Sequence, residues 1–328
     1  GAMTFFDVFN GDADGICALH QLRLAQPRDA VLVTGVKRDT ALLQRLIAAP
    51  GDDVTVLDIP LDRNRGALLA LLQTGVQVRY FDHHHASSPL PQHPLLQIEI
   101  DVSSAVCTSI IVDRLLGGRY RSWAVVAAFG DNLLAAAARL ASTLSVPAAT
   151  VAAWRDLGEC LNYNAYGGSE SDLVCSPAEL YRTLAPYEDA QQFIEQEPVL
   201  ARIRAARTAD MVQALACAPE IDTAGVTLHQ LPDAAWARRV IGSFANHLAT
   251  SDWKRAHAVL VPYADASFSL SLRVPQIAGI SAAAFCRRFG GGGRRIAGGC
   301  DGLPPEELPR VSDELIRSYP MSSSQDES

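Results

Sequence analysis

The sequence predicts an α/β protein with an N-terminal domain built on a parallel sheet, a helical connector and a smaller C-terminal α+β domain. Strands and helices alternate at the start of the chain, and these strands are apolar almost throughout, which is typical of a parallel sheet covered on both faces. Near Pro219 the pattern changes to half-exposed strands. We expect the three parts at 3–185, 186–221 and 222–320, followed by a disordered tail at 321–328.

The individual elements follow from local composition. Runs rich in β-branched and aromatic residues predict four N-terminal strands, at 4–9, 30–36, 53–59 and 76–81. Helical patterns lie between these strands, and beyond them, at 15–26, 39–49, 63–73, 103–153 and 177–218. In the last third, alternating patterns predict strands at 225–231, 257–264 and 267–275, with helices at 278–289 and 304–319.

Composition excludes several classes of protein. A net charge of −8 over 328 residues argues against a broad nucleic-acid surface. No apolar run reaches the roughly 18–20 residues that span a bilayer, and the N-terminal residues lack the pattern of a secretory signal. The seven cysteines are scattered without a CxxC pair, which favours reduced thiols. We therefore expect a cytoplasmic protein that does not contact membranes.

Acidic residues follow three of the predicted N-terminal strands. Asp12 and Asp14 follow the first, Asp58 ends the third, and Asp82 ends the fourth, directly before the histidines of "DHHH". Each aspartate alone reads as a helix cap or turn residue. Ligands, however, bind beyond the carboxyl ends of parallel strands, and converging carboxylates repel one another unless cations neutralise them.

The donor types indicate which cations would bind. Carboxylates joined by His83, with Asp131 of "FGDN" as a further ligand, suit Mn²⁺, Mg²⁺ or Fe²⁺ better than a thiolate zinc site. The number of carboxylates is sufficient for two ions, which suggests a two-metal hydrolase with ions about 3.5–4 Å apart. His84 would donate to a phosphate oxygen or act as a general acid.

The motifs resemble those of the DHH phosphoesterase superfamily. "GDADG", the "LD" at Asp58, the "DHH" beginning at Asp82 and the "GD" at Asp131 match the four motifs of its catalytic domain. "SLSLR" followed by "FGGGGRRIAGG" resembles the glycine-rich, phosphate-binding part of the DHH-associated C-terminal domain. The superfamily includes RecJ-type exonucleases, nanoRNases that also hydrolyse pAp, and cyclic-dinucleotide phosphodiesterases.

The resemblance implies roles for these residues. One Mn²⁺ would be held by Asp12 and Asp58, and a second by Asp14, Asp58, His83 and Asp131. Asp82 would orient the adjacent histidine, His84 would face the scissile phosphate, and a water would be the nucleophile.

The chain departs from the family pattern at three positions. Val8 stands where many members have a histidine ligand, Asn10 stands where RecJ-type members have an acid, and Arg294 follows the glycine motif in place of the usual histidine. Asn10 offers a neutral oxygen to the first metal, and Arg294 offers a permanent charge to phosphate.

Further residues are predicted to bind substrate. The glycine motif would form a backbone anion site together with nearby arginines, which gives the set Gly291, Gly292, Gly293, Arg273, Arg294 and Arg295. Lys37 and Arg38, at the end of the second strand, either contact substrate or lie on a solvated helix start.

The predicted function is hydrolysis, by a Mn²⁺-dependent phosphodiesterase, of short oligonucleotides or small nucleotides held between the two domains, as in nanoRNases and pAp phosphatases. The alternatives are a cyclic-dinucleotide phosphodiesterase, a RecJ-like single-strand exonuclease, and a nucleotide-binding regulator with weakened catalysis. A related pyrophosphatase is disfavoured because of the glycine motif. A homodimer is expected from the family resemblance alone.

Overall fold

The computed structural model describes residues 1–321, and this part of the chain forms two compact units. The first unit comprises Gly1–Ala165 and Ser169–Arg204, and the second comprises Tyr166–Gly168 and the chain from Ala205 onward. Residues 186–221, expected to be a separate connector, are thus divided between the units after Arg204. Of the predicted tail at 321–328, residues 322–328 lie outside the described residues.

The first unit contains a five-stranded parallel sheet in the order β2-β1-β3-β4-β5. The four predicted strands are present as β1 (Phe5–Phe9), β2 (Val31–Val33), β3 (Asp53–Leu57) and β4 (Gln77–Asp82). The sequence analysis missed the edge strand β5 (Leu96–Ile100). Its sequence LQIEI contains two polar residues and is only partly buried, so it lacks the apolar run that marked the central strands.

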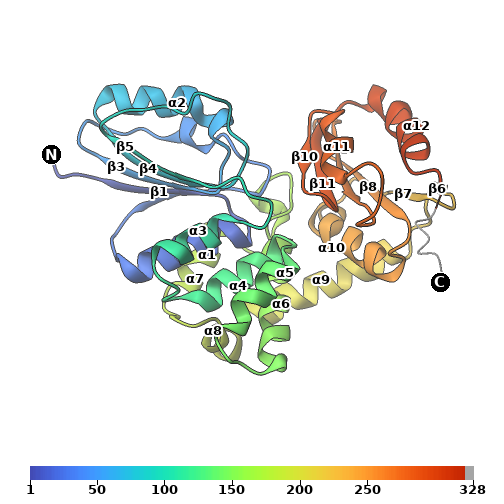
Figure 1. Ribbon diagram of the computed structural model, residues 1–328, viewed down its shortest axis with the longest axis horizontal. Helices are drawn as coiled ribbons and strands as arrows, with labels where there is room; N and C mark the ends of the chain where they lie inside the picture. Colours follow the sequence, from blue (N-terminus) through green and yellow to red (C-terminus); the bar gives the residue numbers. More distant parts are fainter. Residues whose placement is uncertain (322–328) are drawn as a thin grey trace. The chain divides into compact units, whose positions relative to one another are not determined.

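Helices cover both faces of this sheet (Figure 1). Helix α2 (Leu61–Thr74) packs over one face, where its leucines join the core formed by alternate side chains of β1, β3 and β4. Helices α1 (Ala13–Ala25) and α3 (Thr108–Leu115) cover the other face. Helices α1 and α2 begin just beyond the carboxyl ends of β1 and β3, as in other α/β sheets.

The helix predicted at 39–49 was wrong. This segment contains only a short 3₁₀ turn, η1 (Leu42–Arg45). The side chain of Asn64 accepts from the Leu43 amide at 3.1 Å and donates to the Thr40 carbonyl at 2.8 Å. Because a side chain satisfies these backbone groups, the segment does not need a regular helix to do so.

A helical layer completes the first unit. Its members are α4 (Arg121–Gly130), α5 (Leu134–Ser142), α6 (Ala148–Tyr163), η2 (Glu170–Asp172), α7 (Pro177–Leu184), α8 (Ala190–Gln196) and the first part of α9 (Val199–Leu215). These elements confirm the helical segments predicted within 103–153 and 177–218. Among the described residues, none of the helices is both long enough and apolar enough to cross a membrane.

The second unit has a six-stranded mixed sheet in the order β10-β11-β9-β8-β7-β6. Its strands are β6 (Ile221–Asp222), β7 (Val226–Gln230), β8 (Ala256–Pro262), β9 (Phe268–Arg273), β10 (Gly292–Gly293) and β11 (Ala297–Leu303). Helix α10 (Ala235–Ser251), which the sequence analysis missed, packs on β8 and β9. The core also includes side chains of α11 (Ala282–Arg287) and α12 (Leu308–Ser318), which follows the turn η3 (Pro305–Glu307).

Candidate metal centre

A tight turn between β1 and α1 places the first two aspartates. Asp12 caps α1, because its Oδ1 accepts from the Gly15 amide at 2.9 Å. The Asn10 side chain supports this turn by accepting from the Asp12 amide at 3.1 Å. A Cβ on Gly15 would lie 2.0 Å from the Asn10 carbonyl oxygen, so only glycine fits there. The "NGDADG" stretch therefore fixes both the turn and the direction of its acids.

Asp14 lies within the first turn of α1 and is held by the start of another helix. Its two carboxylate oxygens accept from the Thr108 and Ser109 amides of α3, at 2.9 and 2.7 Å. Free amides at a helix N-terminus favour a negative charge. Thr108 and Ser109 were not among the predicted site residues, because the "CTS" before an apolar run also reads as a simple helix cap.

Asp58 follows β3 in the left-handed conformation, with a φ of 65°. Aspartate tolerates this region better than most residues, although the conformation is strained. Its Oδ1 accepts from the Thr108 hydroxyl at 3.2 Å and lies 3.1 Å from His83 Nε2. The strained backbone thus directs this carboxylate toward the histidine.

The "DHH" motif ends β4 and brings two imidazoles to the same edge of the sheet. His83 Nε2 is 3.6 Å from Asp14 Oδ2, while His84 Nδ1 is 2.7 Å from Asp82 Oδ1. Asp131, at the C-terminal end of α4, joins them. Donor atoms lie within 4.8 Å of one another in two groups that share His83: Asp58, Asp82, His83 and His84; and Asp14, His83 and Asp131.

Burial and mutual repulsion shift the pKa values of these groups. Burial, reinforced by the neighbouring carboxylates of Asp14 and Asp12, raises the pKa of Asp58 well above its usual value. Burial also raises the pKa of Asp14, against the attraction of His83. Burial favours the neutral form of Asp12 too, but the Lys37 ammonium and hydrogen bonds outweigh it and lower the pKa of Asp12 to about 2.

The two histidines shift in opposite directions. Burial and the adjacent His84 lower the pKa of His83, so its imidazole is neutral and able to bind a cation near pH 7. Burial opposes charge on His84 as well, but Asp82 overcomes this effect and raises the pKa of His84. The second histidine therefore tends to carry the proton.

The donor set fits a hard divalent cation. Asp14, Asp58 and Asp82 are all buried, and Asp82 Oδ2 has no hydrogen-bond partner among the described residues. Buried carboxylates without partners are costly unless a cation binds them. Carboxylate oxygens combined with imidazole nitrogens suit Mn²⁺, Mg²⁺ or Fe²⁺. The sequence-predicted acids thus converge at the carboxyl edge of the sheet.

Asp12 differs from the other acids because an ammonium group binds it. Lys37 Nζ lies 2.7 Å from Asp12 Oδ2, and Asp12 belongs to neither of the two donor groups. Asn10 is buried and its amide donates to the Lys37 carbonyl at 3.0 Å. Arg38 is the next residue of this turn and is half-buried.

The glycine motif of the second unit forms a hairpin. Gly292 and Gly293, as β10, pair with Gly299 and Gly298 of β11. A Cβ on Gly291 would lie 2.1 Å from the Gly299 carbonyl oxygen, so the two backbones approach too closely for any side chain at this position. The motif therefore forms a paired edge of the sheet rather than a flexible loop.

The arginines near this hairpin already make contacts within the second unit. Arg273, buried at the end of β9, donates from Nε to Asn246 Oδ1 at 2.7 Å. Arg295 donates to the carbonyl oxygens of Gln276 and Ala278. The Arg294 amide donates to the Ala297 carbonyl at 2.7 Å and closes the hairpin. Arg295 thus has a structural role that the sequence analysis did not predict.

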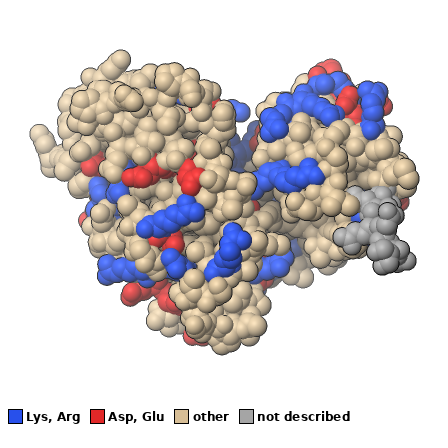
Figure 2. Space-filling model, viewed as in Figure 1, with Lys and Arg blue, Asp and Glu red and all other residues tan. Residues whose placement is uncertain are grey.

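Arginine side chains gather over α11 and α12 in Figure 2. Several are paired with acids of α12 or η3: Arg288 with Glu314 at 2.7 Å, and Arg310 with Glu307 at 2.7 Å. Since these pairs are exposed, we interpret this cluster as a solvated helix face.

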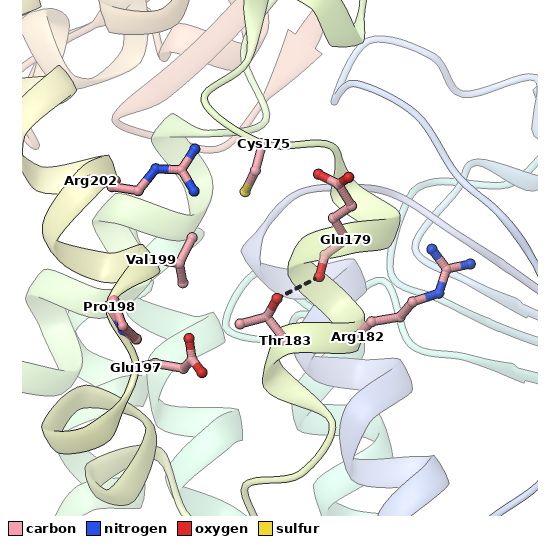
Figure 3. A pocket seen from close by; sticks show the side chains of 8 residues that line it. All are labelled: Cys175, Glu179, Arg182, Thr183, Glu197, Pro198, Val199 and Arg202. Carbon is pink, nitrogen blue, oxygen red and sulfur yellow. Dashed lines mark hydrogen bonds between the residues drawn. The ribbon is translucent and has the colours of Figure 1, made fainter.

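A hollow of about 460 Å³ in the first unit is separate from the acid cluster (Figure 3). Residues of α7, of α9 and of the adjoining loops line it, and they include two arginines and two glutamates. Burial raises the pKa of its Cys175 thiol, which disfavours the reactive thiolate. None of the predicted site residues lines this hollow.

Comparison with known proteins supports the fold. No protein-family model and no curated protein matches the sequence. A structure of exonuclease RecJ bound to manganese is similar, with a TM-score of 0.57 and 18% identity over 95% of this chain and 89% of that one. The pGpG-specific phosphodiesterase PggH from Vibrio cholerae gives a TM-score of 0.55 with 16% identity, covering 96% of this chain and 98% of that one.

A third structure is the DHH domain of a member of the s1p family of ribosomal proteins. Its TM-score is 0.62 at 11% identity, with coverage of 96% of this chain and 86% of that one. Similarity at such low identity establishes the fold. The chain therefore shares the fold of these three solved structures, one of which is described as a DHH domain.

Proposed function

We propose that the protein is a divalent-metal phosphodiesterase that hydrolyses short oligonucleotides or small nucleotides, with Mn²⁺ as the preferred ion. The observation that carries this proposal is the convergence of Asp14, Asp58, Asp82, His83, His84 and Asp131 within two overlapping donor groups. The similar structures support it, because one is an exonuclease bound to manganese and another is described as a pGpG-specific phosphodiesterase.

The same arrangement supports a set of metal ligands. His83 lies between Asp14 and Asp58, and Asp131 completes the group on the Asp14 side. When bound, a divalent cation supplies positive charge for the phosphoryl oxygens and lowers the pKa of a water nucleophile. The amides of Thr108 and Ser109 hold the Asp14 carboxylate in a fixed orientation toward the site.

His84 is suited to serve as the proton donor. Its Nδ1 is bound to Asp82, which fixes the ring and leaves Nε2 as the atom that can carry a proton to substrate. Asp82 raises the pKa of His84 against the effect of burial, so a protonated ring is available near neutral pH. As the water oxygen bonds to phosphorus, the P–O ester bond breaks and the leaving oxygen takes the proton from His84.

Charge and backbone geometry favour small substrates. The net charge of −8, and the ion pairs that occupy the arginines over α11 and α12, argue against a long nucleic-acid strand. In the second unit, the glycine hairpin and Arg294 would bind a terminal phosphate of the substrate. A cytoplasmic location accords with seven cysteines that form no disulfide.

The proposal is tested by Mn²⁺-dependent hydrolysis of a substrate panel. The panel contains 5′-phosphorylated dinucleotides, pAp, pGpG, a cyclic dinucleotide, and longer RNA and DNA strands. We expect turnover of the short linear substrates, its loss in His83→Ala, and its retention in Asp29→Asn, which alters an exposed acid outside the cluster. Metal binding without hydrolysis of any substrate would instead support the nucleotide-binding regulator, and turnover by His83→Ala would contradict the assigned site.

A further inference from the structure

Both oxygens of the Asp12 carboxylate are already bound by groups of this chain. Oδ1 accepts from the Gly15 amide at 2.9 Å, and Oδ2 lies 2.7 Å from Lys37 Nζ. The Asp12 side chain is 4% exposed, so little water reaches it. An ammonium group at this distance supplies the positive charge that a buried carboxylate needs.

Asp58 is the acid that contacts the Asp12 side chain, and Asn10 and Val8 supply no further metal ligand beside it. Both the oxygen and the nitrogen of the Asn10 side chain are hydrogen-bonded: the oxygen accepts from the Asp12 amide, and the nitrogen donates to the Lys37 carbonyl. Val8 is fully buried in the core beneath α2. Both donor groups found among the described residues lie on the His83 side and exclude Asp12. The Lys37 ammonium thus supplies the positive charge beside Asp12.

The backbone holds Lys37 in place. Its amide donates to the Ala165 carbonyl at 2.9 Å, and its carbonyl accepts from the Asn10 side chain at 3.0 Å. Its side chain is 32% exposed, so the ammonium lies at the edge of the site rather than sealed within it. The position is therefore ordered, with the ammonium at the edge of the site.

The choice of lysine is informative in this chain. The sequence has 28 lysines and arginines together, and Lys37 and Lys254 are the only lysines among them. Lysine presents a compact point charge, whereas arginine presents a broad planar group. Lys37 therefore places a compact positive charge directly on the Asp12 carboxylate.

We propose that the Lys37 ammonium takes the place of one metal ion, so the site binds a single divalent cation on the His83 side. Lys37 neutralises Asp12 and adds its positive charge to the edge of the site. This inference rests on the proposed phosphodiesterase function and revises the sequence-based expectation of two ions.

The test is the number of Mn²⁺ ions bound, measured by native mass spectrometry and by electron paramagnetic resonance of free Mn²⁺. Wild type and Lys37→Arg, which keeps the charge, are expected to bind one ion. The double variant Asn10→Asp with Lys37→Met restores a carboxylate and removes the ammonium, so we expect it to bind two. Circular dichroism establishes that each variant is folded, and the single variant Lys37→Met is used if the double variant is not.

The outcomes separate this inference from the proposed function. Two ions in wild type, or one ion in wild type and in both Lys37→Met variants, would overturn the role of Lys37 and leave the phosphodiesterase proposal intact. No ion bound to wild type would overturn the proposed metal centre, and this inference with it.

Discussion

The two candidate substrate-contacting regions are built in opposite ways. At the carboxyl edge of the first sheet, buried side chains carry the chemistry, and each acid is held by a specific partner: Asp14 by the start of α3, Asp12 by Lys37 and Asp82 by His84. At the glycine hairpin of the second unit, the absence of side chains lets two backbones approach one another.

The two regions are therefore suited to different roles. The buried carboxylates of the acid cluster repel one another, and burial together with this repulsion raises the pKa values of Asp14 and Asp58. A bound cation would relieve the repulsion. The glycine hairpin has no such cluster of carboxylates, and it presents closely paired backbone with its peptide groups. We therefore expect substitutions in the first region to change metal binding and catalysis, and substitutions in the second to change stability and substrate affinity.

The largest effect is expected from Asp58→Asn. The variant retains a residue that tolerates the left-handed backbone but removes the carboxylate beside His83. We expect hydrolysis to fall by about 1,000-fold or more, equivalent to about 4 kcal/mol. The metal-free variant should also unfold at a higher temperature, because a buried, repelled carboxylate has been removed. A lower melting temperature of the metal-free variant would show that the cluster is not under electrostatic strain.

The next effect distinguishes two adjacent glycines. Gly291→Ala should destabilise the second unit by about 2–4 kcal/mol, because its Cβ would lie 2.1 Å from a backbone oxygen. Gly292→Ala is the matched control, since its Cβ would meet nothing within 4 Å, and its stability should change by less than about 1 kcal/mol. Urea denaturation measures both. Equal losses would show that the hairpin does not require the close approach.

The pH dependence of the first unit should reveal a buried neutral histidine outside the cluster. His20 bonds the Tyr187 carbonyl through Nε2 at 2.6 Å, and burial lowers the pKa of His20 from 6.5 to about 4. Between these values the unfolded state binds more protons, so stability falls as pH falls. Wild type should lose about 2 kcal/mol more than His20→Gln between pH 7.5 and pH 5. Parallel urea-denaturation profiles for the two proteins would contradict this.

The smallest effect is expected on the basic face of α12. Arg317 is 75% exposed in its pair with Glu314. Arg317→Ala should change the free energy of unfolding by less than about 0.5 kcal/mol and leave the affinity for a 5′-phosphorylated dinucleotide unaltered. A tenfold loss of affinity, measured by fluorescence anisotropy, would make this face part of the substrate site.

Much of the fold could be predicted because the central strands and their helices carry strong periodic patterns. The ends of β1, β3 and β4 also placed the acids correctly at one edge of the sheet. The missed elements have weak local signals: β5 contains two polar residues and is only partly buried, and the segment near Leu42 is held by the side chain of Asn64. Long-range contacts decide such segments.

The sequence could not show which partner each acid would find. The ammonium of Lys37 on Asp12 and the amides of Thr108 and Ser109 on Asp14 bring together residues distant in the chain. The Arg295 contacts to the 276–278 loop are likewise invisible in a linear motif. Motifs identified the chemical groups, and the fold determined their pairing.

Calorimetric titration of the metal-free protein with Mn²⁺ shows whether the acid cluster is a divalent-cation site. We predict saturable binding to wild type and to Asp29→Asn, and its loss in Asp58→Asn. Binding that is equally strong in Asp58→Asn, or absent from wild type, would contradict the account.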